Sequence, residues 1–208
     1  MTSLPLTVTG EVELADFIGA RGPHCLIVAR HGETDWNVEG RLQGQQDSSL
    51  NSRGRSQVPA AARFLRSIPL HQVHSSSLRR CQRTAESIAE TNISSPEVIS
   101  SDLLKETALG ILEGELKDEQ STAELTRHYQ EFCKGEIHYR VPEGENLHDA
   151  AARVQRLFVV RADLMNGPGI HLIAVVLLDQ GAERQPHTRV CHHDGRQLRM
   201  IERNQREL

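Results

Sequence analysis

The apolar run at residues 25–29 ends abruptly at the polar turn Arg30-His31-Gly32, and this junction is the strongest constraint on the fold. Hydrophobic residues that stop at a polar turn are typical of a buried strand whose end carries a site. An arginine guanidinium matches the geometry of a phosphate group, a histidine can act as a nucleophile, and a glycine lets a ligand approach the backbone closely. The junction therefore predicts a strand that presents His31 for phosphoryl chemistry.

Short apolar runs and helical patterns alternate along the rest of the chain. The patterns predict strands at residues 24–29, 73–76, 98–101 and 170–178, and helices at residues 56–67, 78–91, 115–134 and 147–165. Residues 40–54 are rich in Gly, Gln, Asp, Ser and Asn, which is typical of a loop. This alternation predicts an α/β fold, a three-layer sandwich in which helices flank a mostly parallel central sheet.

Apolar stripes mark the buried faces of the last two predicted helices. A residue three or four positions after another lies on the same helix face, so the stripe identifies the side that packs inward. The inward residues are predicted to be Leu125, Tyr129 and Phe132 in the first of these helices, and Ala150, Ala151, Val154, Leu157, Phe158 and Leu164 in the second.

The bulk composition fits one globular domain without a polyanionic partner. The chain has 208 residues and a net charge of -4, so no global basic field attracts nucleic acid or a membrane surface. No apolar run approaches the roughly 20 residues that span a bilayer, and the first residues lack the basic start of a signal peptide. The four cysteines form no CxxC pair, which favours reduced thiols in a cytoplasmic protein. We expect an N-terminal extension at residues 1–22 and a single domain at residues 23–208, atypical or truncated after residue 176.

Four further motifs follow the Arg30-His31-Gly32-Glu33-Thr34 turn in order. They are Arg41-Leu42-Gln43-Gly44; Ser75-Ser76-Ser77-Leu78-Arg79-Arg80 with Thr84-Ala85; Leu104-Lys105-Glu106 with Gly110 and Glu113-Gly114; and Pro142-Glu143-Gly144-Glu145-Asn146. Together these motifs resemble the histidine phosphatase superfamily, in its phosphoglycerate mutase-like branch, over residues 24–176 plus a weaker tail. That family includes cofactor-dependent phosphoglycerate mutase and phosphatase relatives, and the resemblance implies the same α/β sandwich.

The resemblance also implies a mechanism. His31 would attack phosphorus and form a phosphohistidine, and Glu106 would protonate the leaving oxygen and later take a proton from the attacking water. The catalytic residues are therefore predicted to be His31, Glu106, Arg30 and Arg80. The phosphate- and substrate-binding residues are predicted to be Arg30, Thr34, Asn37, Gln43, Gly44 and Arg80. No metal ion and no cofactor is expected, because the arginines supply the positive charge that Mg²⁺ supplies in other phosphoryl-transfer sites.

The chain departs from the family pattern after the last predicted core strand. The family carries a second catalytic histidine there, in a histidine–glycine turn that a helix follows. This chain instead has Leu177–Gln185, which contains no histidine–glycine pair. Three explanations stay open: a deletion that impairs the chemistry, a divergent member with another donor, or a different alignment of the tail.

The tail at residues 187–201 resembles the closing hairpin of the family, with two short strands around Asp194-Gly195. His187, His192 and His193 are weak candidates for a replacement donor. A zinc site that combines these histidines with Cys191 is disfavoured, because adjacent residues of a strand point to opposite faces of the sheet.

These observations predict a metal-independent phosphatase that hydrolyses a small phosphorylated metabolite through a phosphohistidine on His31. Two alternatives stay open: phosphoglycerate mutase-type phosphoryl transfer, and a catalytically impaired pseudoenzyme that binds phosphoesters. The intact turn at His31 and the presence of Glu106 favour chemistry, because a pure binding module needs no general acid. The expected partner is a small phosphorylated substrate, with no nucleic acid and no membrane, and a homodimer stays open as the assembly.

Overall fold

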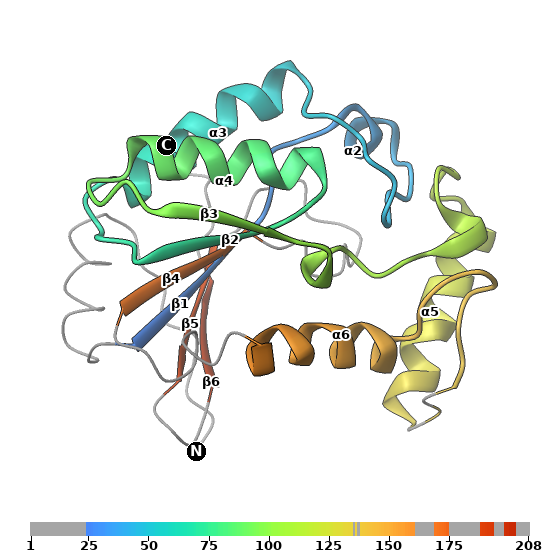
Figure 1. Ribbon diagram of the computed structural model, residues 1–208. Coiled ribbons are helices and arrows are strands. Elements are labelled where there is room, and N and C mark those ends of the chain that lie inside the picture. The colour runs from blue at the N-terminus through green and yellow to red at the C-terminus, as the bar shows by residue number, and fades with distance from the viewer. Residues whose placement is uncertain are drawn as a thin grey trace.

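The computed structural model describes residues 24–134, 136, 138–160, 169–174, 188–193 and 198–202. The predicted N-terminal extension and the Leu177–Gln185 segment lie outside these residues. Six strands form one sheet in the order β3-β2-β4-β1-β5-β6 (Figure 1). The strands are β1 (His24–Ala29), β2 (Gln72–Ser76), β3 (Glu97–Ser101), β4 (Gly169–Ala174), β5 (Thr188–His193) and β6 (Leu198–Glu202).

The sheet is mostly parallel, as predicted. The neighbours β3 and β2, β2 and β4, and β4 and β1 pair in parallel, whereas β5 runs antiparallel to both β1 and β6. The antiparallel pair of β5 and β6 confirms the two predicted closing strands. The described part of the predicted strand at residues 170–178 is β4, which lies between β1 and β2.

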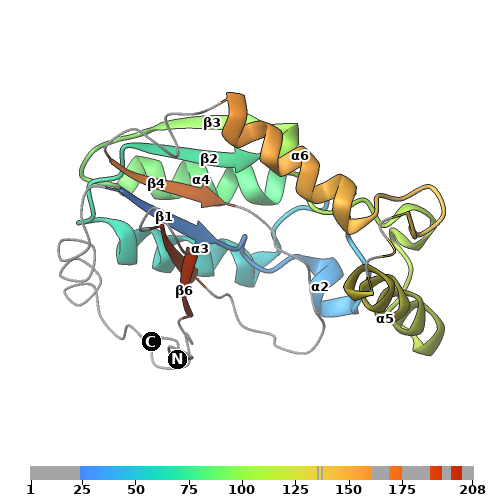
Figure 2. The same ribbon diagram turned by 90° about the horizontal axis from the view of Figure 1, so that it is seen from below.

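Helices cover both faces of this sheet, which confirms the three-layer prediction. In the two views α3 and α4 lie on one face and α6 lies on the opposite face (Figures 1 and 2). The helices are α2 (Asp35–Glu39), α3 (Ser52–Leu65), α4 (Arg79–Thr91), α5 (Glu119–Cys133) and α6 (Leu147–Val160), with two short 3₁₀ turns, η1 (Asp102–Leu104) and η2 (Gly110–Leu112). None of the helices in the described part of the chain has the length and hydropathy of a membrane span.

The main core lies between the sheet and the pair α3 and α4. These helices supply Ala62, Leu65, Ala85 and Ile88 to a buried cluster that includes Ile27 of β1. Burial of a leucine or isoleucine side chain stabilises the fold by about 1.5–3 kcal/mol. A second, smaller cluster joins Leu104 of η1 to Leu157 of α6, with Leu103 and Phe158 packed against it. Helix α6, on the opposite side of the sheet, thus anchors the segment that follows β3.

Two predicted helix starts are wrong, and local hydrogen bonds explain both. The side chain of Asn51 accepts a bond from the Gly54 N–H at 2.7 Å, so α3 starts at Ser52 and Gly54 is helical rather than part of the loop. Asp118 caps α5 in the same way through the Ser121 N–H at 2.7 Å. The residues before Asp118 are therefore not helical, and the Lys117 N–H instead donates to the carbonyl of the loop at residue 40.

The predicted inward faces are partly confirmed. Leu157 is buried, whereas Ala151 is exposed because the buried face of α6 is narrower than the predicted stripe. On α5, Leu125 is only half-buried and His128 is the buried residue of the described C-terminal half. The side chains of Tyr129, Phe132 and Leu164 lie outside the described part of the chain.

Asn92, which follows α4, ties the end of α4 to the end of α3 and to the segment that joins α3 to β2. Its Nδ2 donates to the carbonyls of Leu65 and Ile68 at 2.7 and 2.8 Å, and its Oδ1 accepts from the Leu70 N–H at 3.4 Å. The side chain is only 3% exposed. We expect Asn92→Ala to lower the free energy of unfolding by about 2 kcal/mol, because buried backbone groups lose their partners. Chemical denaturation measures this loss.

Glu90→Ala is the matched control, because Glu90 lies in the last turn of α4 and is exposed. Its effect should stay within about 0.5 kcal/mol. Equal unfolding midpoints for the two variants would contradict the role assigned to Asn92.

Candidate active site

The carboxyl ends of the parallel strands meet at one edge of the sheet. Ala29 of β1 and Ser75 of β2 both pair with Ala174 of β4, so the ends of β1 and β2 are level. In Figure 2 the arrowheads of β1, β2 and β4 point to the same edge, toward α2. In α/β sheets this edge is where ligands bind. The predicted residues after β1, β2 and β3 are brought to it by topology alone.

His31 lies directly after β1 and is 4% exposed. Its Nδ1 is 2.6 Å from the carbonyl oxygen of Gly32. A carbonyl can only accept, so Nδ1 carries the proton and the lone pair is on Nε2. This tautomer leaves the nitrogen farther from the backbone as the nucleophilic atom.

Close packing against α3 requires a glycine at position 32, and the sequence did not reveal this requirement. A side chain there would place its Cβ 2.7 Å from the backbone oxygen of Gly54, and a side chain on Gly54 would meet the Glu33 oxygen at 2.0 Å. The turn and α3 therefore touch backbone to backbone. The predicted role of Gly32, close approach of a ligand, remains a prediction, whereas close approach of α3 is observed.

Arg80 is the most deeply buried charged side chain of the site, at 1% exposed. Its Nη1 donates to the Gln46 carbonyl at 2.6 Å and its Nη2 to the Gly44 carbonyl at 2.9 Å. Within the described part of the chain its Nε has no hydrogen-bond partner. Burial lowers the pKa of Arg80, and the charge of Glu106 acts in the opposite sense, but an arginine remains charged at neutral pH. A buried cation with a donor to spare is suited to an anion.

Glu106 follows η1 and is 7% exposed, in contrast to the exposed Glu115. Its Oε1 accepts from the N–H of Thr107 at 2.8 Å. The third nearby acid, Glu113, is occupied in holding two backbone groups, those of Gln45 and Leu109. Glu106 is therefore the buried carboxyl group that lies within electrostatic range of Arg80.

The loop at residues 43–48 connects these side chains. Its carbonyl groups hold Arg80, and the side chain of Gln45 donates to the carbonyl of Glu106 at 3.0 Å. Asp47 accepts from the backbone and side chain of Arg79 at 2.7 Å each, at the start of α4. Gly44, at φ +49°, permits the sharp turn in the middle.

Thr34 and Asn37 differ in what they offer a ligand. Thr34 caps α2, and its hydroxyl is shared among the Asn37 N–H at 3.2 Å, Asn37 Oδ1 at 2.9 Å and Gln43 Oε1 at 3.1 Å. The predicted phosphate contact of Thr34 thus competes with three internal contacts. Asn37 uses its Oδ1 in this cap, and its Nδ2 donor makes no hydrogen bond to any described residue. Gln43 is buried, and its Oε1 accepts from the Thr34 hydroxyl of this cap.

Arg30 is half-buried beside His31. The structure therefore gathers all of the predicted site residues at one sheet edge or in the loop beside it.

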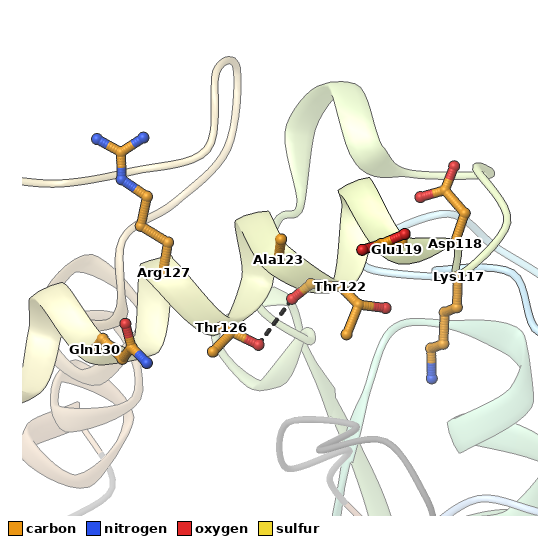
Figure 3. Close-up of a pocket in the computed structure, with 8 residues that line it drawn as sticks. All are labelled: Lys117, Asp118, Glu119, Thr122, Ala123, Thr126, Arg127 and Gln130. Atoms are coloured by element: carbon orange, nitrogen blue, oxygen red, sulfur yellow. Dashed lines mark hydrogen bonds between the residues drawn. The ribbon is translucent and has the colours of Figure 1, made fainter.

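Across the described residues, no group of three or more His, Cys, Asp or Glu side chains could hold a metal ion. An open cavity of about 570 Å³ lies elsewhere, along α5 (Figure 3). It is lined by Lys117, Asp118, Glu119, Thr122, Ala123, Thr126, Arg127 and Gln130, none of which is a predicted site residue.

Two supporting residues carry no role in the sequence prediction. Gln45 and Arg153 both donate to the Glu106 carbonyl, at 3.0 and 3.3 Å. Arg153 had a detectable signal, because it is a charged residue on the inward face of the helix between Ala150 and Leu157. No sequence pattern marked Gln45, because a single glutamine in a polar loop matches no motif.

Comparison with known proteins gives consistent results. A sequence profile of the histidine phosphatase superfamily (branch 1) matches residues 26–176. The chain is 34% identical over 142 residues to a protein of Escherichia coli O1:K1 named "Probable phosphoglycerate mutase GpmB", an alignment that covers 68% of this chain and 65% of that protein. The chain thus spans just under two thirds of the length of this curated relative.

Solved structures with the same fold include two phosphatases. The mycobacterial glucosyl-3-phosphoglycerate phosphatase Rv2419c, in complex with VO3, superposes with a TM-score of 0.61 at 25% identity, covering 86% of this chain and 96% of that one. The α-ribazole phosphatase of Shigella flexneri gives a TM-score of 0.64 at 22% identity, covering 85% and 94%. Bacillus stearothermophilus YhfR gives 0.66 at 23% identity, covering 84% and 94%. At these last two identities the likeness concerns the fold alone.

Gly44→Ala tests the loop that holds Arg80. A Cβ at Gly44 would lie 2.2 Å from Glu113 Oε1, so the Glu113 carboxylate must move away from the backbone groups that it holds. We expect a loss of about 3 kcal/mol of unfolding free energy, the sum of left-handed backbone strain and broken hydrogen bonds. Chemical denaturation provides the measurement.

Gly40→Ala separates the two contributions. Gly40 has φ +72°, but a Cβ there meets nothing within 4 Å. This variant should lose only the backbone part, about 1 kcal/mol. Equal losses at the two glycines would show that the contact between Gly44 and Glu113 has no importance.

Proposed function

Because the chain belongs to the histidine phosphatase superfamily, we propose that it is a metal-independent phosphatase that hydrolyses a small phosphorylated metabolite through a phosphohistidine on His31. The observation that carries the proposal is the buried Arg80 guanidinium. Among the described residues its Nε–H has no hydrogen-bond partner, and the guanidinium lies within electrostatic range of the buried carboxyl group of Glu106. A buried cation beside a buried acid supplies both requirements of phosphoester cleavage, which are charge for the phosphoryl oxygens and a proton for the leaving oxygen.

The reaction consists of two displacements at phosphorus. In the first, His31 Nε2 forms a bond to phosphorus while the ester oxygen departs with the proton of Glu106. In the second, Glu106 takes a proton from water, whose oxygen bonds to phosphorus as the bond to Nε2 breaks, and inorganic phosphate leaves. Arg80 and Arg30 hold the equatorial oxygens, where charge is spread in the transition state. Asn37 adds a neutral donor through Nδ2.

Hydrogen bonds to the backbone support the proposed roles of His31 and Arg80. The hydrogen bond from Nδ1 to the Gly32 carbonyl places the lone pair of His31 on Nε2. The carbonyl groups of the 43–48 loop hold Arg80 rigidly, so little reorganisation accompanies phosphate binding. All of these residues follow β1, β2 and β3, and the proposal does not depend on the segment after β4.

Mutase-type phosphoryl transfer is the second candidate. The 34% identical relative named a probable phosphoglycerate mutase favours it, whereas the solved phosphatase at 25% identity favours hydrolysis of a phosphorylated sugar acid or a similar metabolite. Both reactions share the first displacement, and they differ in whether water or a substrate hydroxyl accepts the phosphoryl group. The net charge of -4 favours a small substrate over nucleic acid.

The decisive experiment is turnover of p-nitrophenyl phosphate in the presence of EDTA. We expect hydrolysis that survives chelation, and His31→Ala should lower kcat more than about a thousandfold because the nucleophile is lost. His148→Ala, which changes an exposed histidine on α6, is the control and should keep full activity. A radiolabelled phosphoryl group trapped on the wild-type protein should be acid-labile and absent from His31→Ala.

Other outcomes would overturn the proposal in distinct ways. Activity that EDTA abolishes would make the mechanism metal-dependent. A folded protein that binds the ester without turnover would be a binding module. Transfer of the phosphoryl group to an added hydroxy acid, faster than its release to water, would favour the mutase.

Arg80→Lys tests the phosphate contact. Lysine keeps the charge but lacks the planar fork that donates to both loop carbonyl groups while Nε remains available, so kcat should fall about 10²–10³-fold. Arg79→Lys is the matched control, because Arg79 is the exposed neighbour with an ion pair to Asp47, and exposed pairs contribute little. Steady-state kinetics on both variants, with thermal melts to verify folding, give the comparison. Similar rates for the two variants would remove Arg80 from the mechanism.

A further inference from the structure

The Glu145–Arg153 ion pair is a densely hydrogen-bonded cluster that the proposed catalytic mechanism does not use. Arg153 lies on α6 and Glu145 lies two residues before that helix. Arg153 Nε donates to Glu145 Oε1 at 2.8 Å and Nη2 donates to Oε2 at 2.8 Å. The two side chains are only 11% and 22% exposed. Such a two-point contact fixes the orientation of the guanidinium plane.

The remaining donors of Arg153 all reach the backbone around Glu106. Nη1 donates to the carbonyls of Leu103 and Lys105 at 2.9 and 2.8 Å, and Nη2 donates to the Glu106 carbonyl at 3.3 Å. A guanidinium has five N–H groups, and each has an acceptor here. Arg153 therefore has no donor left for a ligand, and its function must lie in what it holds.

Glu145 holds the other side of the same segment. Its Oε2 accepts from the Ala108 N–H at 3.1 Å and from the Gln45 side chain at 3.4 Å. Burial raises the pKa of Glu145, but the hydrogen bonds and charge of Arg153 and the Ala108 N–H outweigh this and lower it. The pair thus stays ionised and clamps the backbone both before and after Glu106.

Gln45 links this clamp to the phosphate site. The same amide donates to the Glu106 carbonyl and to Glu145, while the adjacent Gly44 and Gln46 carbonyl groups hold Arg80. A movement of the clamp would therefore change the position of the acid relative to the phosphoryl oxygens. General acids act over hydrogen-bond distances of roughly 2.6–3.2 Å, and a 1 Å displacement can cost about a hundredfold in rate.

We propose that the Glu145–Arg153 pair is a positioning device that holds the general acid Glu106 at the distance from the phosphoryl group that leaving-group protonation requires. This inference rests on the proposed phosphatase function. It assigns a purpose to the Pro142–Asn146 motif, which the catalytic mechanism leaves without one. Neither residue of the pair contacts the substrate, so both are positioning residues.

The test exploits the fact that an acid matters most when the leaving group is poor. Phenyl phosphate and p-nitrophenyl phosphate have nearly the same shape, but the phenol leaving group is more basic and needs the proton more. The ratio of kcat/KM for the two esters reports on leaving-group protonation in the first displacement. Arg153→Gln should lower kcat/KM for phenyl phosphate about a hundredfold and for p-nitrophenyl phosphate less than about tenfold.

Two variants serve as controls. Arg156→Gln changes an exposed arginine on α6 and should leave the ratio unchanged. Glu145→Gln preserves the shape but removes the charge, so it should shift the ratio in the same direction by a smaller amount. It also replaces Arg153→Gln if that variant does not fold. Competitive inhibition by inorganic phosphate should be unchanged in each variant, because Arg80 is not altered.

The experiment distinguishes a wrong proposed function from a wrong positioning inference. If wild-type protein hydrolyses neither ester in EDTA, the proposed function is wrong. If wild-type protein is active and both esters slow equally in Arg153→Gln and Glu145→Gln, the pair has only a general structural role and the positioning inference is wrong. An unchanged ratio with unchanged rates refutes it too.

Discussion

The burial of one positive charge organises this site. Arg80 lies at the start of α4 with almost no contact with solvent, and a charge in that position is costly unless hydrogen bonds compensate it. Two loop carbonyl groups, from Gly44 and Gln46, provide that compensation. For both carbonyl groups to face the guanidinium the loop must turn sharply, and Gly44 with its left-handed backbone makes the turn possible. The carboxylate of Glu113 then fixes the loop by accepting from its backbone.

The sheet topology brings the other groups of the site to the same edge. Because β1, β2 and β3 are parallel within the same sheet, the segments that follow them reach one edge, and each carries one chemical group. The nucleophilic imidazole follows β1, the guanidinium follows β2 and the carboxyl group follows β3. The 43–48 loop crosses this edge and bonds to the groups after β2 and β3. A fold that depended on long side chains to span the site would lose more conformational entropy on ordering them.

Features that depend on side-chain identity could be predicted from the sequence, whereas hydrogen bonds to backbone groups could not. The bounds of β1 follow from an apolar run that ends at Arg30, a local signal. The acceptors of Arg80 are carbonyl groups, which every residue possesses, so no sequence pattern marks Gly44 or Gln46 as their source. Thr34 and Asn37 also form a capping box, in which a threonine and an amide three residues later satisfy the first turn, and this second role was not part of the sequence prediction, which gave Thr34 a phosphate contact. The predicted burial of Ala151 was wrong because α6 packs on a narrower face than its apolar stripe suggests.

Two arginines show how the same side chain can serve different purposes according to the number of acceptors around it. Arg153 meets acceptors at every N–H, so it is saturated and can only hold its neighbours in place. Arg80 meets acceptors at Nη1 and Nη2 but none at Nε within the described residues, so it is fixed in orientation and still able to bind an anion. A guanidinium with fewer partners would be mobile, and one with more would have nothing to offer a ligand. The count of acceptors, rather than burial or charge, therefore separates the arginine that binds from the arginine that positions.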